Sequence, residues 1–195
     1  FEGKIDEAKK LVSETFSLET CKDYSLLNLM GYIKLFEKDY KEALLIYQKY
    51  LEIAISSQDK ENEHIGYHQL AMVYREMNDY QTALNYIDKE REVIEDSFSE
   101  DALKSSVNNY EQGYLRLKLG EIAKAIMYME QSLKQALQTD DLIAQACSYR
   151  GLGEIYSAKN SEKSQENFLQ AIELFEKAGD QIGAQEVKNL LNKKK

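Results

Sequence analysis

Four segments of this 195-residue chain repeat one pattern. They read LMGYIKLFEKDYKEAL, QLAMVYREMNDYQTAL, EQGYLRLKLGEIAKAI and GLGEIYSAKNSEKSQ, and each carries a small residue at the same place: Gly31, Ala71, Gly113 and Gly153. The steps between these small residues are 40, 42 and 40 residues. Self-similarity at a nearly fixed step indicates a repeat protein, in which each unit packs mainly on its neighbours.

The composition favours helices. The chain has no proline and only nine glycines, although loops and β-turns normally use both. Apolar residues recur at three- and four-residue steps, as in Leu44, Tyr47, Leu51 and Ile55, and we find no segment that alternates as a strand would. We therefore expect an all-α fold. Its expected helices span residues 4–19, 24–37, 40–57, 60–77, 80–97, 100–118, 121–139, 141–159, 162–178 and 181–193.

The breaks between these helices carry helix-start residues. Asp39 with Glu42 fits a capping box, Asp79 and Ser161 can cap in the same place, and Gly120 supplies a flexible turn. Each unit is therefore expected to contain two antiparallel helices joined by a short break. We expect small residues on both helices to let the backbones approach closely, and those of the second helix are Ala43, Ala83, Ala125 and Ser164.

With these residues in place, the chain resembles the tetratricopeptide repeat family. The family's pattern is clearest in the second repeat, where it is made up of Tyr67, Leu70, Ala71, Tyr74, Asn78, Asp79, Tyr80 and Ala83. The resemblance implies an all-α, right-handed superhelical solenoid of antiparallel helix pairs that forms a single domain over residues 1–195. Its parts would be a partial repeat at 1–20, repeats at 24–57, 64–97, 106–139 and 146–178, and a closing helix at 180–193.

The chain departs from the family in two respects. Its step of about 40 residues exceeds the usual step of about 34, and the proline that often ends a unit is missing. Both departures fit lengthened helices, as in the long-helix variants of some bacterial regulators.

The resemblance also implies a binding surface. In the family, the first helix of each unit lines an inner, concave surface through a few fixed positions. Those positions predict a peptide-binding groove made of Asn28, Tyr32, Phe36, His68, Met72, Arg75, Tyr110, Tyr114, Lys118 and Arg150. Its aromatic and thioether groups would contact apolar groups, and its cations could hold a carboxylate. The alternative is that the aromatics pack between successive helices as core.

The two histidines, His64 and His68, stand one helical turn apart, which raises the question of a metal-dependent enzyme. The zinc-protease pattern needs a Glu directly after the first His, and Ile65 occupies that position. We expect His68 in the groove, His64 near its rim, and no metal or cofactor at either. Paired acid and base candidates are not apparent, so we expect a protein that is not an enzyme.

Charge and hydropathy limit the classes of partner that this chain is expected to bind. The chain has 34 acidic and 25 basic residues, a net charge of −9 that repels a phosphate backbone, so we expect no direct nucleic-acid partner. No apolar run approaches the ~20 residues that span a bilayer, so no membrane is expected. Cys21 and Cys147 suggest no disulfide framework and fit the reducing cytoplasm. We expect the charged run at residues 88–92 to be a solvated face.

The leading functional hypothesis is a non-catalytic scaffold that binds a partner protein or peptide in the concave groove. The alternative is the ligand-sensing module of a bacterial peptide-responsive regulator, which would carry a DNA-binding or effector-binding segment ahead of the repeats. Because the chain opens with Phe1 rather than Met, we expect it to be trimmed, which leaves room for such a segment. Self-association through an exposed end helix stays open.

Overall fold

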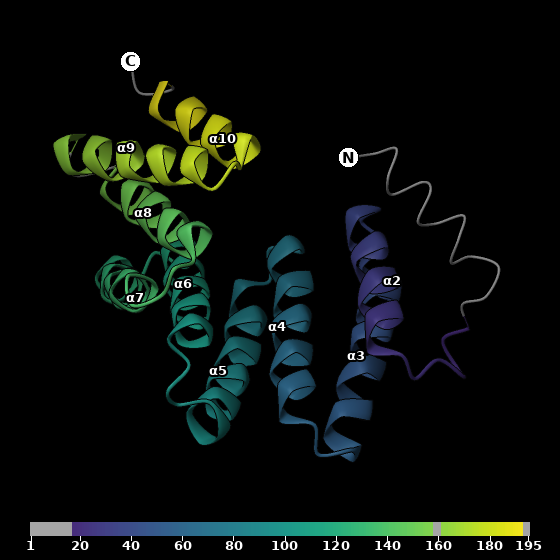
Figure 1. The fold of residues 1–195 in the computed structure, drawn as a ribbon. Helices are drawn as coiled ribbons and strands as arrows, with labels where there is room; N and C mark the ends of the chain where they lie inside the picture. The colour runs from purple at the N-terminus through teal and green to yellow at the C-terminus, as the bar shows by residue number, and fades with distance from the viewer. Residues whose placement is uncertain (1–16, 158–160, 193–195) are drawn as a thin grey trace. The chain divides into compact units, whose positions relative to one another are not determined.

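The computed structural model describes residues 17–157 and 161–192, and this part of the chain contains helices and no strand. The all-α prediction is therefore confirmed. No helix in the described ranges combines the length and the hydropathy needed to cross a bilayer. The helices are α2 (Tyr24–Phe36), α3 (Tyr40–Ser56), α4 (Lys60–Glu76), α5 (Tyr80–Ser97), α6 (Ala102–Lys118), α7 (Ile122–Ala136), α8 (Leu142–Tyr156), α9 (Ser161–Lys177) and α10 (Gln181–Asn192) (Figure 1).

Each helix expected from residue 24 onward is present, and the helix expected at 4–19 falls largely outside the described residues. Two helices end three residues earlier than expected: α8 ends at Tyr156 rather than residue 159, and α7 was expected to reach residue 139. Its last regular residue is Ala136, whose carbonyl accepts a hydrogen bond from the Thr139 hydroxyl at 2.8 Å. This side chain satisfies one of the free carbonyls of the last turn and ends the helix early.

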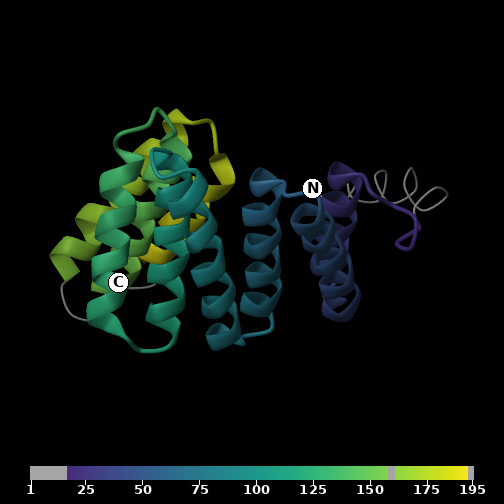
Figure 2. The same cartoon turned by 90° about the horizontal axis from the view of Figure 1, so that it is seen from below.

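The described residues divide into two compact units, and the boundary lies inside α5, between Val93 and Ile94. In unit 1, α3 packs on both α2 and α4, and the same neighbours are seen in two views (Figures 1 and 2). In unit 2, α6 packs on α7 and α8, and α9 packs on α8 and α10. That residues 1–195 form one domain stays a prediction.

Glycines on the first helix of a pair face large side chains on the second. A Cβ added at Gly31 would lie 2.4 Å from Cζ of Tyr47, and one at Gly153 would lie 2.6 Å from Cδ1 of Phe168. Both rings are completely buried. The expected close approach of the paired helices is therefore confirmed at these positions, because only the missing side chain of glycine leaves room for the ring.

The small residues of the second helices are buried as well. Ala83 and Ala125 have no exposed surface, and Ser164 donates a hydrogen bond to the carbonyl of Gly153 at 2.8 Å. Ser164 thus adds a polar link between α8 and α9 at the point where the two backbones come close.

Aspartates begin most of the described helices. The predicted caps at Asp39 and Asp79 are confirmed, because each carboxylate accepts a hydrogen bond from the N–H three residues on. The reciprocal half of the capping box is wrong: the N–H of Asp39 donates to the carbonyl of Lys34 at 2.9 Å and so belongs to the end of α2. The side chain of Ser161 lies outside the described residues. Within the described residues, the aspartates that cap helices in this way are Asp23, Asp39, Asp59, Asp79, Asp101, Asp141 and Asp180.

Left-handed residues end many of the same helices. The φ angle is 62° at Lys38, 55° at Gln58, 61° at Asn78, and 79° at both Gly120 and Gly179. In each case the next N–H donates to the carbonyl five residues before it, as from residue 59 to residue 54 at 2.9 Å. This is the Schellman arrangement. It stops a helix without proline, and an acidic residue follows at once to begin the next helix.

The left-handed turn at Gln58 generates a first prediction. Gln58→Gly should raise the free energy of unfolding by about 0.5–1 kcal/mol, because a side chain is strained at positive φ and glycine is not. Asn78→Gly should gain less, because asparagine tolerates this conformation. Urea denaturation measures both. Gln48→Gly, in the middle of α3, is the matched control and should cost about 1 kcal/mol. A loss of stability in Gln58→Gly would contradict the assignment.

The close packing of paired helices generates a second prediction, tested within α7. Ala125→Leu should lower the free energy of unfolding by about 2 kcal/mol, because Ala125 is fully buried and its carbonyl oxygen lies 3.2 Å from the position that a Cβ would take at Gly113 of α6. Ala123→Leu, the same change at an exposed position, should stay within about 0.5 kcal/mol of the parent chain. Thermal and urea unfolding followed by circular dichroism measure the difference. Equal effects at the two positions would show that the helices are not tightly packed.

Candidate functional site

Five of the predicted groove residues line one pocket of unit 1. Tyr32 and Phe36 come from α2, whereas His68, Met72 and Arg75 come from α4. The pocket has a volume of about 570 Å³. Its remaining lining residues are Leu35, Lys38, Tyr40, Gln69 and Glu76.

Helical spacing explains why these residues gather. Tyr32 and Phe36 are four residues apart, as are His68 and Met72, so each pair stands on one face of its helix. The opposite faces of α2 and α4 pack against α3, which contacts both helices. α3 therefore sets the separation of α2 and α4, and its first residue, Tyr40, joins the lining of the pocket.

The two aromatic side chains from α2 are exposed. Tyr32 is 48% exposed and Phe36 is 49% exposed, while nearby Leu27 and Ile33 are buried. The alternative that the aromatic residues pack between successive helices as core is therefore wrong for Tyr32 and Phe36. Large apolar side chains that share an open pocket mark a surface able to contact a ligand.

The rim of the pocket is charged. A nitrogen of Arg75 lies 3.7 Å from a carboxylate oxygen of Glu76, and Lys38 adds a second cation. The helical pattern did not predict Lys38, because this residue lies in the left-handed turn after α2 and no periodicity extends to turn residues. The signal in the sequence was its place, directly before the capping Asp39.

Asn28 is the predicted residue of unit 1 that does not line this pocket. It lies one turn before Tyr32 on α2, and its carbonyl accepts a hydrogen bond of 3.4 Å from the Tyr47 hydroxyl. Burial raises the pKa of Tyr47 well above its usual range, so the hydroxyl keeps its proton and donates. This hydrogen bond ties α2 to α3.

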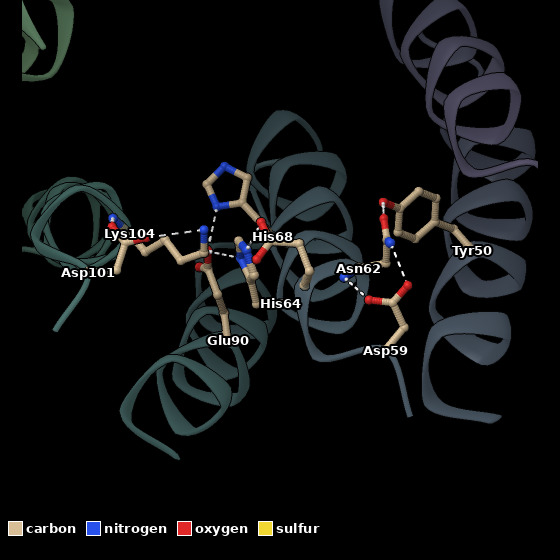
Figure 3. Close-up of polar contacts among 9 residues, drawn as sticks. Tyr50, Asp59, Asn62, His64, His68, Glu90, Asp101 and Lys104 are labelled. Atoms are coloured by element: carbon tan, nitrogen blue, oxygen red, sulfur yellow. Dashed lines mark hydrogen bonds and ion pairs between the residues drawn. The ribbon is translucent and has the colours of Figure 1, made fainter. Parts of the chain in front are cut away.

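The two histidines contact one carboxylate of α5. Nδ1 of His68 lies 3.1 Å from Oε1 of Glu90, and Nδ1 of His64 lies 3.9 Å from the same oxygen (Figure 3). Glu90 is only 2% exposed. His64 is buried and not at the rim as predicted, because its turn of α4 faces α5. The prediction of a solvated charged run is wrong for Glu90 for the same reason.

The side chains grouped around the two histidines bear on the question of a metal site. Residues 17–157 and 161–192 contain no group of three or more His, Cys, Asp or Glu side chains that could hold a metal ion. Oε1 of Glu61 lies 3.5 Å from Nε2 of His64, so both sides of that imidazole face carboxylates. The contacts serve to hold α4 against α5.

A second polar contact fixes the start of α4. The Tyr50 hydroxyl donates to the side-chain oxygen of Asn62, whose nitrogen donates to Asp59 at 2.7 Å (Figure 3). Burial raises the pKa of Tyr50 to about 12, and hydrogen bonds from Asn62 lower the pKa of Asp59. The contact joins α3 to the first turn of α4, the helix that supplies half of the residues that line the pocket.

The predicted groove residues of unit 2 do not all gather in one pocket. The rings of Tyr110 and Tyr114 are stacked with centroids 6.5 Å apart, and Nζ of Lys118 lies 5.0 Å from the centroid of Tyr114. Arg150 forms ion pairs with Glu154 at 3.0 Å and with Glu186 of α10 at 2.8 Å. These contacts place Arg150 in the packing of α8 against α10.

Tyr110 belongs partly to the core. It packs against buried residues of α7 and α8, and burial raises the pKa of its hydroxyl far above the usual range. The core alternative therefore holds for Tyr110. The same ring also lines a smaller pocket of unit 2, between α6 and α8.

Solved structures share this fold. BtubC (BKLC) from P. vanneervenii is 16% identical and matches 99% of this chain and 87% of its own, with a TM-score of 0.68. RapI in its apo form is 16% identical, over 97% of this chain and 56% of its own, with a TM-score of 0.66. A putative kinesin light chain with TPR-like repeats from Podosopora anserina is 16% identical, over 91% of this chain and 90% of its own, with a TM-score of 0.65. These likenesses show an all-α helical-repeat solenoid.

Sequence comparisons give the family. Curated protein sequences yield no significant match. Family models described as tetratricopeptide repeat match residues 66–89 and 104–177. The two matches together cover half of the chain, and one falls in each compact unit. Together with the helix pairs and their small-against-large packing, they show that the chain belongs to the tetratricopeptide repeat family.

Proposed function

We propose that this protein is a non-catalytic interaction scaffold that binds a segment of a partner protein, or a short peptide, in the pocket between α2 and α4. One observation carries the proposal: residues chosen by repeat position, from two separate helices, line one open pocket of about 570 Å³. That volume lies within the range of about 300–1,000 Å³ typical of ligand sites.

The pocket's side chains indicate the chemistry of the bound segment. Tyr32, Phe36 and Met72 offer aromatic and thioether surface, which suits an apolar side chain. Lys38 and Arg75 are the basic residues of the lining, and each can contact a carboxylate. The best fit is therefore a peptide in which an apolar side chain and an acidic group are close neighbours.

The same lining argues for binding rather than catalysis. None of the residues that line this pocket is Ser, Thr or Cys, the side chains that most often act as nucleophiles with an adjacent base. The imidazole of His68 is held by Glu90 at 3.1 Å and thereby packs α4 on α5. We propose no reaction for this protein.

A third prediction tests the pocket. Peptides selected from a random displayed library against the full chain should combine an apolar and an acidic residue. Phe36→Ala and Arg75→Ala should each weaken the selected peptide by about 5- to 30-fold, since truncated anchor residues cost about 1–2 kcal/mol. Isothermal titration calorimetry measures the affinities, and circular dichroism checks that the helices are intact.

Matched controls lie on α3, outside the pocket. Leu45→Ala and Lys41→Ala remove an exposed apolar and an exposed basic side chain of the same unit and should leave the affinity unchanged. Equal weakening by all four changes, or none by Phe36→Ala and Arg75→Ala, would refute this site. A change in particle shape on binding, seen by small-angle X-ray scattering, would favour the sensor over the static scaffold.

A further inference from the structure

Unit 2 contains a second pocket. It is lined by residues of α6, α7 and α8 and by Asp141, the residue that caps α8. Its volume is about 300 Å³. Most of its wall is apolar and comes from the side chains of Leu103, Val107, Tyr110, Ile143, Ala144 and Cys147. Burial raises the pKa of the Cys147 thiol to about 11, so this sulfur is a neutral part of the wall at pH 7.

The serine hydroxyl groups at the pocket are already engaged. Ser148 donates to the carbonyl of Ala144 at 2.9 Å, Ser132 lies 2.8 Å from Ser148, and Ser106 donates to the carbonyl of Ser132 at 2.9 Å. The hydroxyl proton of each of these three serines therefore has an acceptor within the protein. Ser106 and Ser132, which line the pocket, can accept a hydrogen bond from a ligand but have no proton left to donate.

The charged groups of the lining are both acidic. Glu111 is only 5% exposed, and Asp141 caps α8 through the N–H of Ala144 at 2.9 Å. None of the ten lining residues is basic. The nearby cation Arg150 forms ion pairs with Glu154 and Glu186. The pocket thus offers apolar surface, acceptors and negative charge.

We propose that this pocket binds an apolar group that ends in a protonated amine. The apolar wall would cover the hydrocarbon part, while the carboxylates and the serine oxygens would face the ammonium group. An anionic ligand would meet two like charges in a partly buried site and is therefore disfavoured. The amine could be a small free molecule or the lysine side chain of a partner. The proposal goes beyond the proposed function, because it assigns a different ligand chemistry to a different pocket.

Methyl NMR on the full chain tests this with three probes of one shape: 4-phenylbutylamine, 4-phenylbutyrate and 4-phenylbutan-1-ol. Adding the amine should shift the methyl signals of Leu103, Val107, Ile143 and Ala144 until they saturate. The amine should bind at least about tenfold more tightly than the carboxylate, with the alcohol between them. Equal affinities of amine and carboxylate, or no shift with any probe, would overturn the proposal.

The source of the amine is resolved by a second pair of probes. N-acetyl-lysine methylamide carries an ammonium group on its side chain, whereas its ε-acetylated form carries a neutral amide. Saturable shifts with the charged form alone would support a lysine of a partner. If 4-phenylbutylamine binds and both lysine probes fail, the result supports a free amine.

Variants separate the site from the fold. Ile143→Lys places a competing cation at the pocket and should weaken 4-phenylbutylamine at least about tenfold. Ile182→Lys, the same change on exposed α10, should leave the affinity unchanged. Glu111→Gln should reduce the preference for amine over alcohol. Equal binding of the amine by Ile143→Lys and the parent chain would overturn the proposal. Neither pocket variant alters the α2–α4 pocket, so failure here leaves the proposed function standing.

Discussion

The structure depends on fitting a large side chain of one helix into a gap on its paired helix. At Gly31 and Gly153 that gap is a missing Cβ, filled by the rings of Tyr47 and Phe168. The contact is short range and steep, since a few tenths of an ångström separate close packing from overlap. It therefore fixes the rotation and the axial position of each helix, and with them the side chains that each helix presents to solvent.

The helix ends carry the second constraint. A left-handed residue closes one helix with a Schellman hydrogen bond, and an aspartate directly after it opens the next, as at Gln58 and Asp59. Two residues thus replace a longer loop between successive helices. This explains how the chain connects so many helices without proline. Short connections also keep neighbouring helices antiparallel, so pockets form between alternate helices, as between α2 and α4.

Local signals predicted the helices well, and contact-dependent features less well. Apolar periodicity and caps gave most helix boundaries, and repeat position brought Tyr32, Phe36 and Arg75 to one pocket. The errors concern residues whose surroundings are set by another helix: Glu90 reads as part of a solvated run, yet α4 covers it with two imidazoles. The groove position of Arg150 stays a prediction, but its ion pair with Glu186 of α10 was not expected from the sequence. Neither neighbour is visible in the local sequence.

Lys38 connects stability with recognition. Its backbone adopts the conformation that glycine tolerates best, and the same residue contributes charge to the pocket between α2 and α4. A glycine there would relax the turn and strengthen the fold while removing the ammonium group. Selection for thermal robustness and selection for an acidic ligand would therefore push this single position in opposite directions, a conflict that the equivalent turn at Gln58, outside that pocket, does not face.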